Sequence, residues 1–171
     1  MAKITKKTLL KHLSKSDKED IIREVVTLFN KFTNVKEYYT AELTDETNPM
    51  LERYKKKITA AYSLPNPKER STNINANKLI KEFKKISIYE RELADLMLHR
   101  VECGIVAFNT NNKRSETFYH CILNSFEEAC GLIYSDNLIN EFKSRINKAL
   151  KDSQSGKFEI HKKMKEASKD L

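Results

Sequence analysis

The chain has 171 residues, of which 39% are hydrophobic and 33% are charged, and it contains 3 Gly, 3 Pro and no Trp. This composition excludes a disordered chain, and the length allows one domain with a core of its own or two small subdomains. The apolar residues come in short clusters broken by charges, so no run reaches the roughly 18 residues of a membrane span. We see neither a secretory signal nor a lipidation motif at the N-terminus.

Apolar residues at spacings of three and four predict helices along nearly the whole chain. Capping boxes at Ser16 to Glu19 and at Ser87 to Glu90 predict two of the helix starts. The pair Asn48-Pro49 predicts a third start. In chain order, we expect helices over residues 6–13, 17–32, 35–43, 49–64, 75–85, 87–108, 115–134 and 138–151, followed by a polar final helix.

The predicted fold is therefore one all-α domain, residues 1–171, of eight to nine antiparallel helices. Pro65-Asn66-Pro67 must end a helix, so a subdomain boundary is expected near residues 65–74. A compact bundle and a short helical-repeat-like stack both fit the pattern. We expect the core to contain Ile22, Val26, Phe29, Leu93, Leu96, Met97, Val106, Phe118, Ile122, Phe126, Ile133 and Phe142.

Several segments resemble a bacterial family of small helical proteins that is known as a domain of unknown function. The resemblance rests on Leu10 to Asp17, on Val35 to Tyr39 and on Leu79 to Gly104, which includes Glu92-Leu93-Ala94-Asp95-Leu96-Met97-Leu98. It covers most of the chain and implies a cytosolic helical protein without an assigned catalytic residue. The chain departs from the family near residues 156–161, where a tryptophan is expected and none is present.

A His/Cys group is the sharpest candidate for chemistry. If the helices on either side of Asn112 form an antiparallel hairpin, then His99, Cys103, His120 and Cys121 come to similar heights, and two His with two Cys suit tetrahedral zinc. However, adjacent residues of a helix point about 100° apart, so His120 and Cys121 rarely bind one ion. We therefore expect the cysteines to be small core residues and predict no metal or other cofactor.

An acidic row on one predicted helix is the second candidate. Glu92, Asp95, His99 and Glu102 recur at helical spacing, but a di-iron bundle needs Glu-x-x-His, and Asp95 and His99 are one residue too far apart for that motif. We expect this row to be a solvated acidic face.

A basic surface is the third candidate, because the formal net charge is +8 and both ends of the chain are basic around an acidic middle. Lysines bind phosphates without reading bases, so these side chains would suit non-specific nucleic-acid binding. The candidate residues are Arg53, Lys55, Lys56, Lys57, Lys78, Lys81, Lys84 and Lys85.

Taken together, these patterns favour a non-catalytic helical scaffold that binds a protein partner, because no catalytic motif stands in the sequence. The alternative is non-specific nucleic-acid binding through the lysine-rich helix faces. The three cysteines are odd in number and form no CxxC motif, which indicates reduced thiols and a cytoplasmic location.

Overall fold

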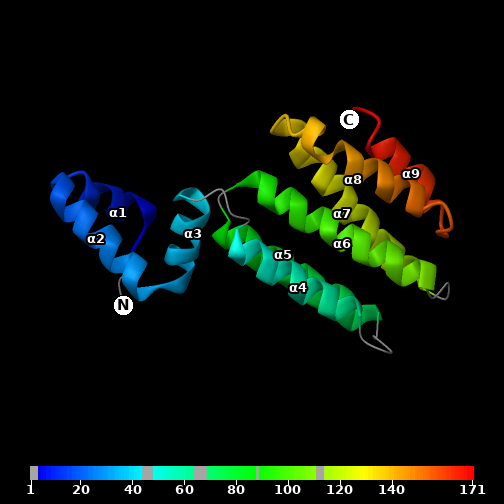
Figure 1. Cartoon of the computed structure of the whole chain (residues 1–171), viewed down its shortest axis with the longest axis horizontal. Coiled ribbons are helices and arrows are strands. Elements are labelled where there is room, and N and C mark those ends of the chain that lie inside the picture. The colour runs from blue at the N-terminus through cyan, green and yellow to red at the C-terminus, as the bar shows by residue number, and fades with distance from the viewer. Residues whose placement is uncertain (1–3, 44–47, 64–68, 88, 111–113) are drawn as a thin grey trace. The chain divides into compact units, whose positions relative to one another are not determined.

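A computed structural model describes residues 4–43, 48–63, 69–87, 89–110 and 114–171, without the side chains of residues 41, 42 and 69–71. Within these ranges the chain forms nine helices and no strand, which confirms the all-α prediction (Figure 1). None of the described helices is both long and apolar enough to cross a membrane. The helices are α1 (Lys6–Leu13), α2 (Lys18–Lys31), α3 (Thr33–Leu43), α4 (Pro49–Tyr62), α5 (Glu69–Ile86), α6 (Glu90–Thr110), α7 (Glu116–Ser135), α8 (Ile139–Asp152) and α9 (Ile160–Ala167).

The chain divides into two compact units, residues 1–50 and residues 51–171. This division lies N-terminal to the boundary that the sequence predicts near residues 65–74. Residues 64–68 of that segment lie outside the described residues, and residues 69–74 form the first turns of α5.

The first unit contains α1, α2 and α3, and its helix starts are fixed by local hydrogen bonds. The cap of α2 is Asp17, whose Oδ1 accepts from the backbone N–H of Asp20 at 2.7 Å. Ser16, the predicted cap, instead donates from Oγ to the carbonyl of His12 at 3.3 Å. A carboxylate at this position also interacts favourably with the helix dipole, which explains why Asp17 takes the role.

The expected core residues of α2 are not enclosed. Ile22 and Val26 are each 50% exposed, and Phe29 is half-buried beside the ring of Tyr39, with the two ring centroids 6.2 Å apart. No residue of α1 or α2 is buried. The prediction of a core at Ile22 and Val26 is wrong, because three short helices offer too few neighbours to surround these side chains.

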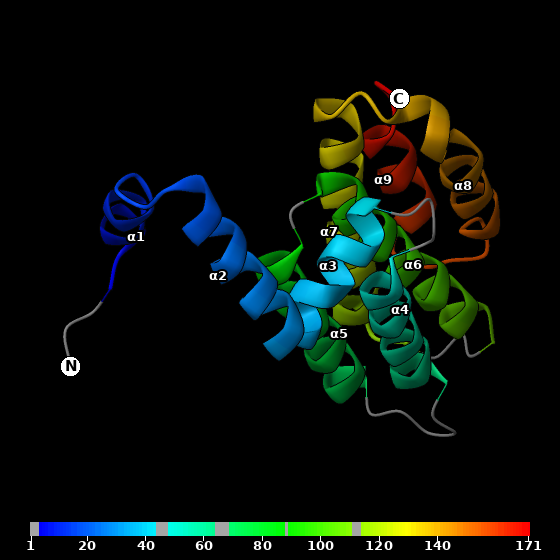
Figure 2. The same ribbon diagram turned by 60° about the vertical axis from the view of Figure 1, so that its left-hand side comes forward.

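The second unit is built around α6, which packs against α5, α7 and α8, while α7 also packs against α9 (Figure 2). A Cβ atom at Gly104 of α6 would lie 2.2 Å from Cδ1 of Ile122 on α7, so the glycine allows a close approach of these helices. The prediction of core residues is confirmed here for Leu93, Leu96, Met97, Phe118, Ile122, Phe126, Ile133 and Phe142.

Val106 is an exception on α6, because 65% of it is exposed. It lies three residues after Cys103 and four after Glu102, and so it continues the polar side of the helix. The apolar residues of α6 cover a broad stripe of the helix, and the sequence pattern includes Val106 in it. The prediction of Val106 as a core residue is therefore wrong.

Helices α4 and α5 lie side by side (Figure 1). The ring centroids of Tyr54 and Phe83 are 5.2 Å apart, and Thr72 donates from Oγ1 to the carbonyl of Ala61 at 3.4 Å. These contacts leave one side of α4 directed at α6.

Candidate functional site

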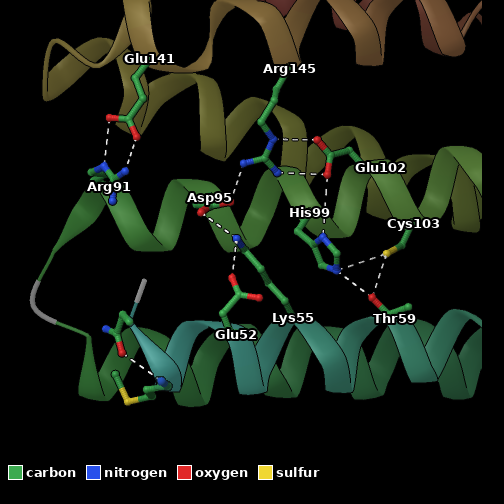
Figure 3. A network of polar contacts seen from close by, with 12 residues as sticks. Glu52, Lys55, Thr59, Arg91, Asp95, His99, Glu102, Cys103, Glu141 and Arg145 are labelled. Carbon is green, nitrogen blue, oxygen red and sulfur yellow. Dashed lines mark hydrogen bonds and ion pairs between the residues drawn. The ribbon is translucent and has the colours of Figure 1, made fainter. Parts of the chain in front are cut away.

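A network of polar side chains joins α4, α6 and α8 in the second unit (Figure 3). Its centre is one side of α6, where Asp95, His99, Glu102 and Cys103 recur at spacings of three and four and therefore share a face. Helix α4 and helix α8 supply the residues that face this side of α6.

Asp95 connects all three helices through its two carboxylate oxygens. Oδ2 accepts from Nζ of Lys55 on α4 at 2.9 Å, and Oδ1 accepts from Nη1 of Arg145 on α8 at 2.5 Å. Lys55 also donates to Glu52, one turn earlier on α4, at 3.1 Å. The side chains of Asp95 and Lys55 are 15% and 18% exposed, so water screens this ion pair less than a surface pair.

Arg145 adds a two-point contact with Glu102. Its Nε and Nη2 donate to the two carboxylate oxygens of Glu102 at 2.8 and 3.0 Å. A second contact between α6 and α8 lies at the start of α6, where Nε of Arg91 donates to Oε2 of Glu141 at 2.9 Å. The bidentate geometry fixes the planar guanidinium of Arg145 in position.

The charges of the network shift the pKa of its members in the direction that keeps them ionised. Burial acts to raise the pKa of Asp95, but the hydrogen bonds and charges of Lys55 and Arg145 outweigh this effect and lower it. Burial likewise acts to lower the pKa of Arg145, and its contacts with Glu102 and Asp95 outweigh that effect and raise it.

His99 and Cys103 form the uncharged end of the network. Nε2 of His99 and Oγ1 of Thr59 on α4 are hydrogen-bonded at 2.8 Å, and Sγ of Cys103 lies 3.6 Å from the same nitrogen. Nδ1 of His99 lies 3.8 Å from Oε2 of Glu102. Burial lowers the pKa of His99, and the charge of Glu102 offsets only part of this effect.

The chain of contacts from Cys103 to His99 to Glu102 resembles a nucleophile, a base and an orienting carboxylate. Burial raises the pKa of Cys103, however, and the hydrogen bond from Thr59 lowers it only in part. The thiol is therefore mostly protonated at neutral pH, whereas an activated nucleophile needs a depressed pKa. The cluster acts chemically as a paired-charge link between three helices, with a neutral imidazole and a neutral thiol beside it.

The four His and Cys candidates for a metal site do not come together. His99 and Cys103 are neighbours, but His120 is exposed, with Nε2 3.5 Å from Oε1 of Glu116 on its own helix. Cys121 is half-buried on α7. Among the residues that the structure describes, no group of three or more His, Cys, Asp or Glu side chains is placed to hold a metal ion.

The acidic row differs from the expected solvated face. Asp95 and Glu102 are partly buried and paired with bases from α4 and α8. Glu92 is 6% exposed and accepts from Oγ of Ser87 at 3.1 Å, so it belongs to a separate contact at the start of α6. The helical spacing of the row is a signal that sequence reasoning can detect, but its partners lie 40 to 50 residues away in the chain.

The basic candidates fall into two groups. Lys55 is held in the network, Arg53 is half-buried, and Lys57 lies over the ring of Tyr54 with Nζ 5.1 Å from its centroid. Exposed side chains of α4 and α5 make up the rest: Lys56, Lys78, Lys81, Lys84 and Lys85. Nζ of Lys78 lies 3.9 Å from Oε1 of Glu82, one turn later on α5, so part of the charge of Lys78 is compensated.

Comparison with protein families places most of the chain in a known family. The model of a family of unknown function, DUF6155, matches residues 4–170. No curated protein and no solved structure matches the chain.

Proposed function

Because the chain belongs to DUF6155, a family of unknown function, we propose its function from its own residues: it is a non-catalytic cytoplasmic protein that binds a protein partner through α2. The observation that carries this proposal is the apolar surface of α2. Ile22, Val26 and Phe29 follow the i, i+4, i+7 spacing of a helix that binds in a groove of another protein. The first two are half exposed, and Phe29 is half-buried.

The charges of α2 suit a protein partner better than a nucleic acid. The helix carries three basic and three acidic side chains in the segment KEDIIREVVTLFNK, so it has no net positive charge to attract phosphates. Phe32, which follows the helix, is 54% exposed and extends the apolar surface. The partner that fits this surface is a protein with an apolar groove in which α2 can bind.

Thiol chemistry supports the cytoplasmic part of the proposal. The three cysteines, Cys103, Cys121 and Cys130, are all free. Unpaired thiols are typical of proteins in a reducing compartment.

The test is cross-linking of the tagged full-length protein in the organism that encodes it, followed by affinity purification and quantitative mass spectrometry. The variant is Ile22→Gln with Val26→Gln, and the control is Thr27→Gln with Asn30→Gln, two exposed polar positions of the same helix. We expect a defined set of proteins whose recovery falls at least several-fold in the first variant and not in the control. Recovery that is equal in both variants, or no enrichment over the tag alone, would contradict the proposal.

A second candidate, non-specific nucleic-acid binding, is favoured by the exposed lysines of α5. Lys81, Lys84 and Lys85 are exposed within two turns of helix. Fluorescence anisotropy with labelled DNA and RNA between ~20 and ~200 mM salt tests it, because phosphate contacts weaken steeply with salt. Salt-sensitive micromolar binding that the triple Lys→Gln variant at these positions abolishes would support this candidate, and no binding at low salt would exclude it.

A further inference from the structure

Arg100 is a charged side chain enclosed in the core of the second unit. It lies on α6 and is 2% exposed. Its Nε donates to the hydroxyl of Tyr62 at 3.3 Å, and its Nη1 donates to Oδ1 of Asn77 at 2.6 Å and to Oγ of Ser125 at 2.8 Å. These partners come from α4, α5 and α7, so four helices meet at this guanidinium.

None of these three hydrogen-bond partners carries a compensating charge. Asn77 and Ser125 have no ionisable group. Burial raises the pKa of Tyr62, and the nearby charge of Arg100 lowers it only in part, so the phenol stays protonated at neutral pH. Arg145, by contrast, is bonded to two carboxylates. A buried charge is costly unless it is paired, so an anion beside Arg100 would stabilise the folded state.

The free donors of Arg100 define the kind of anion. An arginine has five N–H groups, one on Nε and two on each Nη. Those of Nε and Nη1 are used by Tyr62, Asn77 and Ser125, whereas Nη2 is buried and has no partner among the residues that the structure describes. A planar carboxylate or phosphate binds two adjacent nitrogens in a fork, and here only one nitrogen is free. A single compact anion can bind at one nitrogen and needs little space.

We propose that Nη2 of Arg100 binds a small inorganic anion of the chloride class inside the helical core, and that this anion neutralises the buried guanidinium. This site is independent of the proposed partner surface on α2. Anion binding to the folded state alone makes the stability of the protein depend on the anion concentration.

The experiment is thermal unfolding of the full-length protein in sodium gluconate, with chloride replacing gluconate at constant ionic strength. Gluconate is too large to reach the guanidinium of Arg100, which is 2% exposed. We expect the Tm of the wild type to rise by about 3 to 5 °C for each tenfold increase in chloride above its dissociation constant. A Tm that does not depend on chloride, as a neutral water at Nη2 would give, overturns the proposal.

Two arginine variants separate the core site from surface effects. Arg100→Met should abolish the chloride dependence, whereas Arg91→Met, at a half-exposed position of the same helix, should retain it. The same chloride dependence in Arg100→Met and the wild type would overturn the proposal. If Arg100→Met does not fold, the wild type crystallised with bromide decides: an anomalous peak at hydrogen-bond distance from Nη2 supports the site, and no peak there overturns it.

Discussion

Replacement of Arg145 by Met tests whether the polar network holds α8 against α6. The substitution keeps an unbranched apolar stem but removes three hydrogen bonds to carboxylates, one to Asp95 and two to Glu102. A hydrogen bond to a charged group contributes about 1.5–3 kcal/mol, but such contributions are not additive within one network. Lys55 still neutralises Asp95 in the variant, so we expect a loss of about 2–3 kcal/mol in the free energy of unfolding.

Arg91→Met is the matched control, because Arg91 also joins α6 to α8 through a carboxylate. Its side chain is 55% exposed and that of Glu141 is 41% exposed, compared with 31% for Arg145. An exposed pair of this kind contributes about 0.2–1 kcal/mol. The two substitutions are the same in chemistry and differ in burial and in the number of carboxylates left without a partner.

The assay is urea unfolding of the full-length protein followed by far-UV circular dichroism. With a slope of about 2 kcal/mol/M, Arg145→Met should lower the midpoint by about 1–1.5 M, and Arg91→Met by no more than about 0.5 M. If the midpoint of Arg145→Met falls no further than that of Arg91→Met, the network contributes no more than a surface ion pair, and the reasoning from burial is wrong.

Three further outcomes follow from single positions. Gly104→Ala should lower the urea midpoint, because a clash of about 1–3 kcal/mol with the fully buried Ile122 outweighs a gain of about 1 kcal/mol in helix propensity. Gly131→Ala should raise the urea midpoint, because its Cβ would meet nothing within 4 Å. A midpoint that rises for Gly104→Ala and falls for Gly131→Ala would contradict this account. Burial lowers the folded-state pKa of His99 below the unfolded value of about 6.5, so the unfolded chain binds more protons as the pH falls through that value. The wild type should therefore lose more stability than His99→Gln between pH ~7.5 and pH ~5.5, and equal losses would refute this. Burial and the charge of Glu127 raise the pKa of Cys130 to about 12, so iodoacetamide at pH ~8 should label it far more slowly than free cysteine, as mass spectrometry can measure, and labelling at an equal rate would count against it.

The helices could be predicted from the sequence because their signals are local. The range predicted for the first helix, residues 6–13, agrees with α1, and Pro49 begins α4 as its position after Asn48 indicates. The start of α5 could not be predicted in the same way. Residues 69–74 are polar apart from Ile74 and are typical of a linker, but Thr72 and Asn73 are buried in the folded unit, so tertiary contacts extend the helix.

The candidate site could be predicted only in part. The spacing of Asp95, His99 and Glu102 places them on one side of a helix, and the structure has them there. Their partners Lys55 and Arg145 come from helices 40 and 50 residues away, and nothing local in the sequence indicates which lysine or arginine will face which carboxylate. Arg100 is hidden for a similar reason, since a single arginine in an apolar helix gives no sign of being fully enclosed.

The double contact of Arg145 constrains how this chain can change over time. A mutation that removes Arg145 leaves Asp95 with Lys55 alone and takes from Glu102 the arginine that it binds, whereas a mutation that removes either acid still leaves the other to hold the guanidinium. Loss of the arginine is therefore the harder first step. Across the family, we expect an apolar residue at position 145 to occur mainly in sequences where position 95 or 102 has already lost its charge, so these three positions should vary together.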